Sequence, residues 1–204
     1  MNPLTSVVPY QKGSIAQVAN NDPKQMMKIL ANAKGVVVCD VSGSMGQTDA
    51  GPEGTMTRYE VLQHVLSKAQ ADAPGQLLIY AFNSESHGII PTGILPPPGG
   101  GTPFWDAFED IYPKSQMMKQ KIMVLSDGEP TDGKEEMCIA LAEQKKWPIT
   151  CIYVGGLGDV LGGKGFLKRL AAASGGSMDN VSLTKPHLLT EAIKVMLLTD
   201  KVGA

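Results

Sequence analysis

Short, nearly continuous apolar runs alternate along this chain with segments in which apolar residues recur every three or four positions. Continuous apolar runs predict strands that are covered on both faces, because no position of such a strand needs to be polar. Recurrence every three or four positions predicts amphipathic helices. The expected strands are 35–41, 76–82, 121–126 and 148–154, with weaker ones at 88–90 and 178–181.

Several of the expected helices have recognisable start signals. Asp22 followed by Pro23 predicts the start of one helix, and Thr57 with Glu60 three residues later fits a capping box at the start of a second. Asp132 is positioned to cap a helix that follows it. The remaining helices are expected at 103–111, 133–146, 166–173 and 186–198.

This alternation is typical of an α/β fold with a doubly wound, mostly parallel sheet and helices on both faces. A chain of 204 residues is long enough for one domain with a substantial core, and no internal linker divides it. We expect residues 23–204 to form this single domain. Residues 1–22 are polar and weakly periodic, and are expected to form an N-terminal arm.

Composition excludes several classes of protein. The 18 Lys and Arg residues against 20 Asp and Glu leave a formal charge of −2, which argues against a general nucleic-acid binder. The 3 cysteines form no Cys-x-x-Cys pair, which argues against a disulfide framework or a structural zinc site. No window approaches the ~18 apolar residues of a membrane span, and no leader pattern is visible. We therefore expect a cytoplasmic protein that binds neither nucleic acid nor membrane.

Oxygen-bearing side chains gather where the expected strands end. Asp40, Ser42 and Ser44 follow the first strand, Asp127 follows the 121–126 strand, and Thr102 comes just before a helix. In a doubly wound sheet, ligands bind beyond the carboxyl ends of the strands, where the strand order reverses. Two carboxylates and three hydroxyls form an oxygen-only set, which suits Mg²⁺ or Mn²⁺ and suits zinc poorly.

Together these segments resemble a known family. Asp40-x-Ser42-x-Ser44, Thr102 in Gly-Gly-Gly-Thr-Pro, and Asp127 in Ser-Asp-Gly are similar to the three parts of the metal-ion-dependent adhesion site of von Willebrand factor A domains, the fold shared with integrin I domains. The resemblance covers roughly residues 35 to 198. It implies a doubly wound α/β fold with one short antiparallel edge strand, for which residues 88–90 are the candidate.

The resemblance also implies a role for each site residue. Ser42 and Ser44 would bind the cation directly, Thr102 would bind it in the ligand-engaged state, and Asp40 and Asp127 would hold it mainly through water. Neutral hydroxyls and water-separated carboxylates leave such a cation under-neutralised, so an Asp or Glu of a partner protein can complete its octahedral shell. The implied function is cation-dependent protein binding, as an adhesion or scaffolding module that is not an enzyme.

A few more residues are expected near this site. Met45, Gly46, Glu129 and Asp132 are candidates for a ligand-facing rim, and for Asp132 the alternative is that it only caps a helix. Three further acids are expected to lie on a solvated helix face: Asp106, Glu109 and Asp110.

One alternative is a P-loop-like nucleotide binder. The segment 158–165 matches Gly-x₄-Gly-Lys, but Gly165 stands where a P-loop has the Ser or Thr that contacts Mg²⁺. We interpret this segment as a loop with a basic tip, at Lys164.

Another alternative is a metal-dependent phosphatase with Asp40 as its nucleophile. The residue two positions on is Ser42, so the general acid of the haloacid dehalogenase type of phosphatase is missing.

The resemblance to von Willebrand factor A domains indicates an intracellular bacterial or phage member of the family, whose partners would include AAA+ ATPases or stress-response complexes. The sequence predicts no particular oligomeric state.

Overall fold

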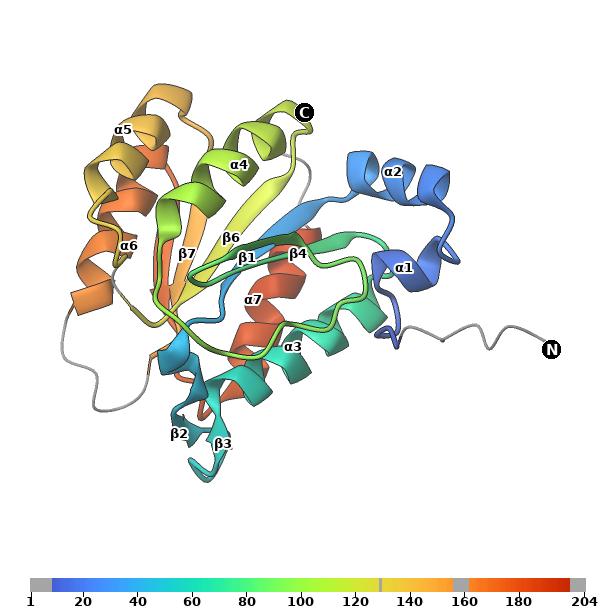
Figure 1. Cartoon of the computed structure of the whole chain (residues 1–204), viewed down its shortest axis with the longest axis horizontal. Helices are drawn as coiled ribbons and strands as arrows, with labels where there is room; N and C mark the ends of the chain where they lie inside the picture. The colour runs from blue at the N-terminus through green and yellow to red at the C-terminus, as the bar shows by residue number, and fades with distance from the viewer. Residues whose placement is uncertain (1–8, 129, 156–161, 199–204) are drawn as a thin grey trace.

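The computed structural model describes residues 9–128, 130–155 and 162–198, and its centre is a six-stranded sheet of order β5-β4-β1-β6-β7-β8 (Figure 1). Neighbouring strands are parallel except β4 and β5, which pair antiparallel at one edge. The expected fold class and its antiparallel edge strand are thus confirmed. The strands are β1 (Gly35–Asp40), β4 (Leu77–Phe82), β5 (Ser86–Ile89), β6 (Lys121–Ser126), β7 (Ile149–Tyr153) and β8 (Ser177–Asn180).

Strand β1 lies at the point where the strand order reverses. It pairs with β4 on one side, with Asp40 opposite Phe82, and with β6 on the other, with Cys39 opposite Leu125. The chain therefore passes from β1 to β4 in one direction and later returns across β1 to β6. In doubly wound sheets ligands bind beyond the carboxyl ends of the strands at such a point, and Asp40 and Asp127 lie at those ends of β1 and β6.

Helices cover both faces of the sheet (Figure 1). Helices α3 (Arg58–Asp72) and α7 (Pro186–Leu198) pack on one face. On the other face lie α4 (Phe104–Met117), α5 (Glu135–Lys145) and α6 (Gly162–Ser174). Alternate residues of β1 enter opposite cores, Val36 on the α4 side and Val37 on the α3 side. This double burial is why the strand has no polar position before Asp40.

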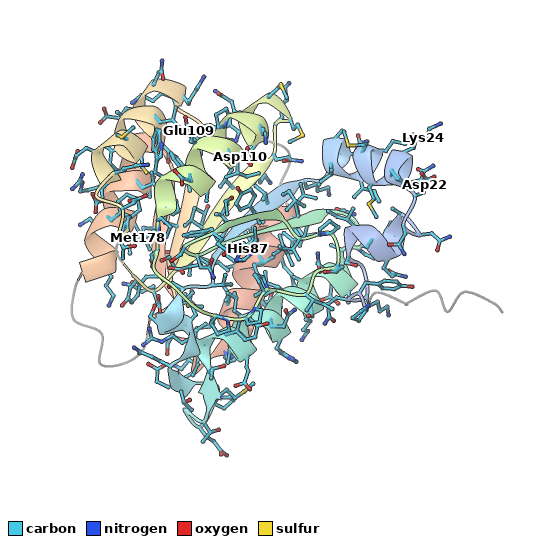
Figure 2. The ribbon with its side chains drawn as sticks, viewed as in Figure 1. Asp22, Lys24, His87, Glu109, Asp110 and Met178 are labelled. Carbon is cyan, nitrogen blue, oxygen red and sulfur yellow. The ribbon has the colours of Figure 1, made fainter. Side chains whose placement is uncertain are left out.

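The described part of the expected N-terminal arm is folded against the domain. Residues 15–18 form the short helix α1 (Ile15–Val18), and Ile15 is buried in the core. The backbone nitrogen of Gln11 donates to the carbonyl of Thr92 at 2.8 Å. The next helix, α2 (Pro23–Asn32), starts as expected, because Asp22 accepts a hydrogen bond from the backbone of Lys24 at 2.9 Å (Figure 2).

Several elements differ from the sequence prediction. Helix α4 continues to Met117 although Pro113 lies inside it, because Tyr112 and Ser115 beyond the expected end are buried. Helix α6 begins at Gly162 rather than at 166. Three short elements between β1 and α3 were not predicted: η1 (Gly43–Gly46), β2 (Thr48–Ala50) and β3 (Met56–Thr57). Within the described ranges, no helix combines the length and apolar character that crossing a membrane requires.

Candidate metal site

Asp40 ends strand β1 and is completely buried, with 0% of its surface exposed. Its Oδ1 accepts a hydrogen bond from the backbone of Ser42 at 2.8 Å, and its Oδ2 accepts one from the hydroxyl of Ser126 at 2.6 Å. Burial raises the pKa of Asp40 to about 6, the bonds from Ser126 and Ser42 lower it, and the charge of Asp127 raises it. A cation bound nearby would favour the charged carboxylate.

Ser42, Ser44 and Asp127 form a row of oxygens beside Asp40. The hydroxyls of Ser42 and Ser44 lie 3.1 Å apart, and the Ser44 hydroxyl donates to Oδ1 of Asp127 at 2.8 Å. Adjacent ligands of an octahedral Mg²⁺ lie about 3.0 Å apart, because each bond to the metal is ~2.0–2.1 Å long. The 3.1 Å spacing of the two hydroxyls therefore fits two adjacent ligands of such a cation, and Oδ1 of Asp127 lies beside them. Ser44 is partly exposed, whereas Ser42 and Asp127 are buried.

Thr102 lies at the same end of the sheet, on the glycine-rich segment that precedes α4. Gly43 donates its backbone hydrogen to the carbonyl of Gly100 at 2.9 Å, which ties this segment to the turn after β1. The backbone of Thr102 exchanges two hydrogen bonds with Thr131, one to its hydroxyl and one from its backbone, each 2.9 Å long. A Cβ on Gly128 would lie 3.9 Å from the Thr102 hydroxyl. Thr102 is thus beside the segment that carries Asp127, although no hydrogen bond joins its hydroxyl to any described residue.

Arg58 is part of this cluster, and sequence reasoning missed it. The side chain is only 2% exposed, and its Nη1 donates to Oδ2 of Asp127 at 2.5 Å. Its Nε and Nη2 donate to the two carboxylate oxygens of Asp49, at 2.9 and 2.6 Å. An arginine at the first position of a helix is ordinarily exposed, and the only sequence signal was its place directly after the cap residue Thr57.

The expected rim is only partly present. Met45 is 0% exposed and packs in the core beneath α3, so it cannot contact a partner as a rim residue would. It is buried because η1 turns its side chain inward. Gly46 is exposed beside the site. Glu129 lies outside the described residues.

Asp132 accepts backbone hydrogen bonds at the starts of two helices. Its Oδ2 accepts a 2.9 Å hydrogen bond from the backbone of Trp105 in the first turn of α4. Its Oδ1 accepts a 3.2 Å hydrogen bond from the backbone of Lys134, the residue before the first residue of α5 (Glu135), so Asp132 also lies at the start of the helix that follows it, as expected. The contact with α4 was not predicted; there Asp132 supplies the acceptor that Pro103, at the cap position of α4, lacks.

The acids of α4 lie on its exposed face, as expected (Figure 2). Asp110 pairs with Lys114 at 2.5 Å, and Asp106 lies 3.5 Å from Lys134. Within the described ranges, no group of three or more His, Cys, Asp or Glu side chains could hold a metal ion. The candidate site contains two carboxylates, and its other oxygens belong to hydroxyl groups.

Much of the P-loop-like segment, 158–161, lies outside the described residues. At its end, the Nζ of Lys164 lies 4.7 Å from the ring centre of Tyr153, a cation–π contact.

Solved structures share this arrangement of strands and helices. A conserved hypothetical protein, BatB from Bacteroides thetaiotaomicron, matches with a TM-score of 0.56 and 17% identity over 82% of this chain and 100% of that one. A von Willebrand factor type A protein from Catenulispora acidiphila matches with a TM-score of 0.58 and 15% identity over 81% of this chain and 42% of that one. The VWA domain of SpRpn10 matches with a TM-score of 0.52 and 14% identity over 76% of this chain and 93% of that one.

The chain has a von Willebrand factor A (VWA) fold. No protein-family model and no curated protein matches the sequence. At these low identities the likeness concerns the fold alone.

Proposed function

We propose that this VWA chain is a protein-binding module, not an enzyme, which engages a carboxylate of its partner through a bound Mg²⁺ or Mn²⁺. The observation that carries the proposal is the row of oxygens formed by Ser42, Ser44 and Asp127, with separations of 3.1 and 2.8 Å, at the switch point of the sheet. The two hydroxyls at 3.1 Å can supply adjacent ligands to one small, hard cation, and Asp127 beside them can hold it through water.

Each residue would have a distinct part in such binding. Ser42 and Ser44 would hold the cation directly, with Thr102 joining them when the partner is engaged, while Asp40 and Asp127 would act mainly through water. Because three of these five groups are neutral, the cation would keep enough positive charge to attract an Asp or Glu of the partner. Because Ser44 is partly exposed, the partner's carboxylate could reach the bound cation from the solvent side.

The alternative functions gain no support from the geometry. A nucleophilic Asp40 would need a free and accessible oxygen, but the carboxylate is buried and both of its oxygens accept hydrogen bonds. The nucleotide-binding alternative depends on a segment that is mostly outside the described residues. Saturable ATP or GTP binding that is abolished by Lys164→Ala would favour it.

Calorimetric titration with Mg²⁺ and Mn²⁺ tests the cation requirement. We expect the unaltered chain to bind, and Asp40→Asn and Asp127→Asn to lose binding while keeping their circular dichroism spectrum. The matched control is Asp106→Asn, which changes an exposed acid outside the candidate site and should bind normally. Absence of any Mg²⁺ or Mn²⁺ binding by the unaltered chain contradicts the proposal.

A pull-down in Mg²⁺ and in EDTA then tests the partner. We expect a protein that is retained in Mg²⁺, released by EDTA and not retained by the Asp127→Asn chain. Our candidates are an AAA+ ATPase or a component of a stress-response complex. Retention that is equal in Mg²⁺ and EDTA would show that binding does not use the cation.

A further inference from the structure

Five lysines gather at the end of the sheet that lies opposite the oxygen cluster. Strands β1, β6 and β7 are parallel neighbours, so the segments that precede them meet at one edge. Gln120 joins these segments, because its side chain donates to the carbonyl of Leu30 at 2.6 Å and its own carbonyl accepts from Nε1 of Trp147 at 2.8 Å. Helix α2 and the C-terminal end of α4 lie at this edge, away from the β2–β3 hairpin (Figure 1). We call this surface the lysine end, and its members are Lys28 and Lys34 before β1, Lys119 before β6, and Lys145 and Lys146 before β7.

The charge of the lysine end is positive, although the whole chain has a formal charge of −2. Lys28, Lys119 and Lys146 are exposed, and the other two members are partly exposed. Among the residues that the structure describes, none of the five forms an ion pair with a carboxylate, whereas Lys114 and Lys194 elsewhere each do. Five unpaired positive charges at one edge attract an anionic ligand.

Two of these lysines have a backbone conformation that suits glycine better. Four non-glycine residues of the described ranges have a positive φ: two are asparagines, and the others are Lys119 at +55° and Lys146 at +53°. Each of the two lysines lies at the C-terminal end of a helix, α4 or α5, where glycine is the usual residue because a Cβ is unfavourable in this conformation. Lysine at both positions costs stability, which favours a role for the side chains outside the fold.

Exposed methionines lie among the lysines. Met27 is 66% exposed and precedes Lys28 on α2, and Met117 is 79% exposed and lies two residues before Lys119. Helix α2 has no buried residue, so its apolar side is incompletely covered. Methionine side chains are flexible and polarisable, and they adapt to apolar partners of different shapes. The lysine end therefore combines positive charge with accessible apolar atoms.

We propose that the lysine end is a second docking surface, which binds an acidic protein segment that carries at least one large apolar side chain. The lysines pair with Asp and Glu side chains of that segment, and Met27 and Met117 contact its apolar side chain. The apolar contact atoms favour a protein segment over a phosphate backbone, and the overall charge of −2 opposes binding to an extended anionic surface. This docking needs no cation and does not depend on the proposed function.

Fluorescence anisotropy of a labelled peptide tests the chemistry of this surface. The probe is a designed helix in which Leu residues on one side are flanked by Glu residues, and two related peptides replace every Glu by Gln or every Leu by Ala. In EDTA, we expect the unaltered chain to bind the probe, to bind the Gln peptide at least about tenfold more weakly, and to bind the Ala peptide more weakly than the probe. Binding of the probe should weaken as salt rises. Absence of probe binding, or equal binding of the three peptides, overturns the proposal.

Glycine substitutions separate binding from stability. Lys119→Gly combined with Lys146→Gly should weaken probe binding by about tenfold, while the midpoint of urea denaturation stays the same or rises because glycine suits both φ values. The structural alternative is that both lysines only stabilise the negative ends of the α4 and α5 dipoles, which predicts a lower midpoint and unchanged binding. Lys119→Gln with Lys146→Gln, a second variant without the backbone change, should bind the probe as weakly as the glycine variant.

A matched control removes the same charge elsewhere. Lys68→Gln combined with Lys168→Gln changes two exposed lysines of α3 and α6, and should bind the probe as the unaltered chain does. Probe binding that is unchanged in the Lys119 and Lys146 variants, or equally weakened in the control, overturns the proposal.

Methyl NMR of the methionines locates the bound peptide. We expect the probe to shift the resonances of Met27 and Met117, and to leave that of Met45, which is buried in η1 beside the candidate metal site, unchanged. A shift of Met45 alone overturns the proposal, because the peptide would then lie at the oxygen cluster. Tighter binding of single-stranded DNA or of phosphatidylserine vesicles than of the probe also overturns it, in favour of a nucleic acid or a membrane.

Discussion

The hydroxyl of Ser126, at the end of β6, donates a 2.6 Å hydrogen bond to Oδ2 of Asp40, at the end of β1. Both groups are buried, so this bond joins the two strand ends at the candidate site. Ser126→Ala leaves an oxygen of a buried carboxylate without its donor and removes the acceptor of a 3.2 Å bond from the backbone of Gly128, which should lower the free energy of unfolding by about 1–3 kcal/mol. Urea denaturation measures this loss, and calorimetry should show weaker Mg²⁺ binding because Asp40 is less firmly held.

Ser115 provides the matched control for that substitution. Its hydroxyl is also buried, but it has no hydrogen-bond partner among the described residues. Ser115→Ala therefore removes an unsatisfied polar group, and the free energy of unfolding should stay the same or rise. An equal loss in both variants would show that the hydrogen bond to Asp40 is not the cause.

The cap that Asp132 provides to α4 should be measurable in the same way. Asp132→Ala removes the acceptor of the 2.9 Å bond from the backbone of Trp105 and of the 3.2 Å bond from the backbone of Lys134, and should cost about 1 kcal/mol of unfolding free energy. Asp106→Ala, in the same first turn but exposed and 3.5 Å from Lys134, should cost less than about 0.5 kcal/mol. Similar losses in both would indicate a general effect of negative charge near the helix start rather than a cap.

These caps show which parts of the fold could be predicted from sequence. The signals at Asp22 and at Thr57 with Glu60 are confirmed because each joins residues two or three positions apart. For Asp132 the sequence predicted only the contact at the start of α5, because its other partner, Trp105, lies 27 residues earlier in the chain. A pattern of neighbouring residues cannot indicate a cap that depends on how two loops meet in space.

The same distinction applies to the candidate site. Asp40 and Ser42 belong to one short segment, and the strand before them predicted their place at the sheet edge. Arg58 enters the site only because α3 begins close to the end of β6, a relationship that the topology creates and no motif records. Met45 lies among polar residues in the sequence, yet the turn of η1 buries it.

The cysteines should be unreactive in the folded protein. All three, Cys39, Cys138 and Cys151, are free and buried. Burial raises the pKa of each thiol, that of Cys138 to about 12, so the reactive thiolate is scarce. We expect Ellman's reagent at about pH 8.5, where an ordinary cysteine is half ionised, to label none of them until the chain is denatured. Rapid labelling of the native protein would contradict this burial.

The position of Thr102 should depend on Gly100, in the segment before it, and not on the neighbouring Gly99. Gly100 has a φ of +68°, and a Cβ there would lie 2.3 Å from the hydroxyl of Ser84, which accepts a hydrogen bond from the backbone of Gly101. Gly100→Ala should therefore lower the unfolding free energy by more than about 1 kcal/mol. It should also weaken cation-dependent retention of a partner, because Thr102 moves with this segment. Gly99→Ala adds a methyl group that meets nothing within 4 Å, and should change neither measurement. Equal effects of the two substitutions would contradict the assignment of this role to Gly100.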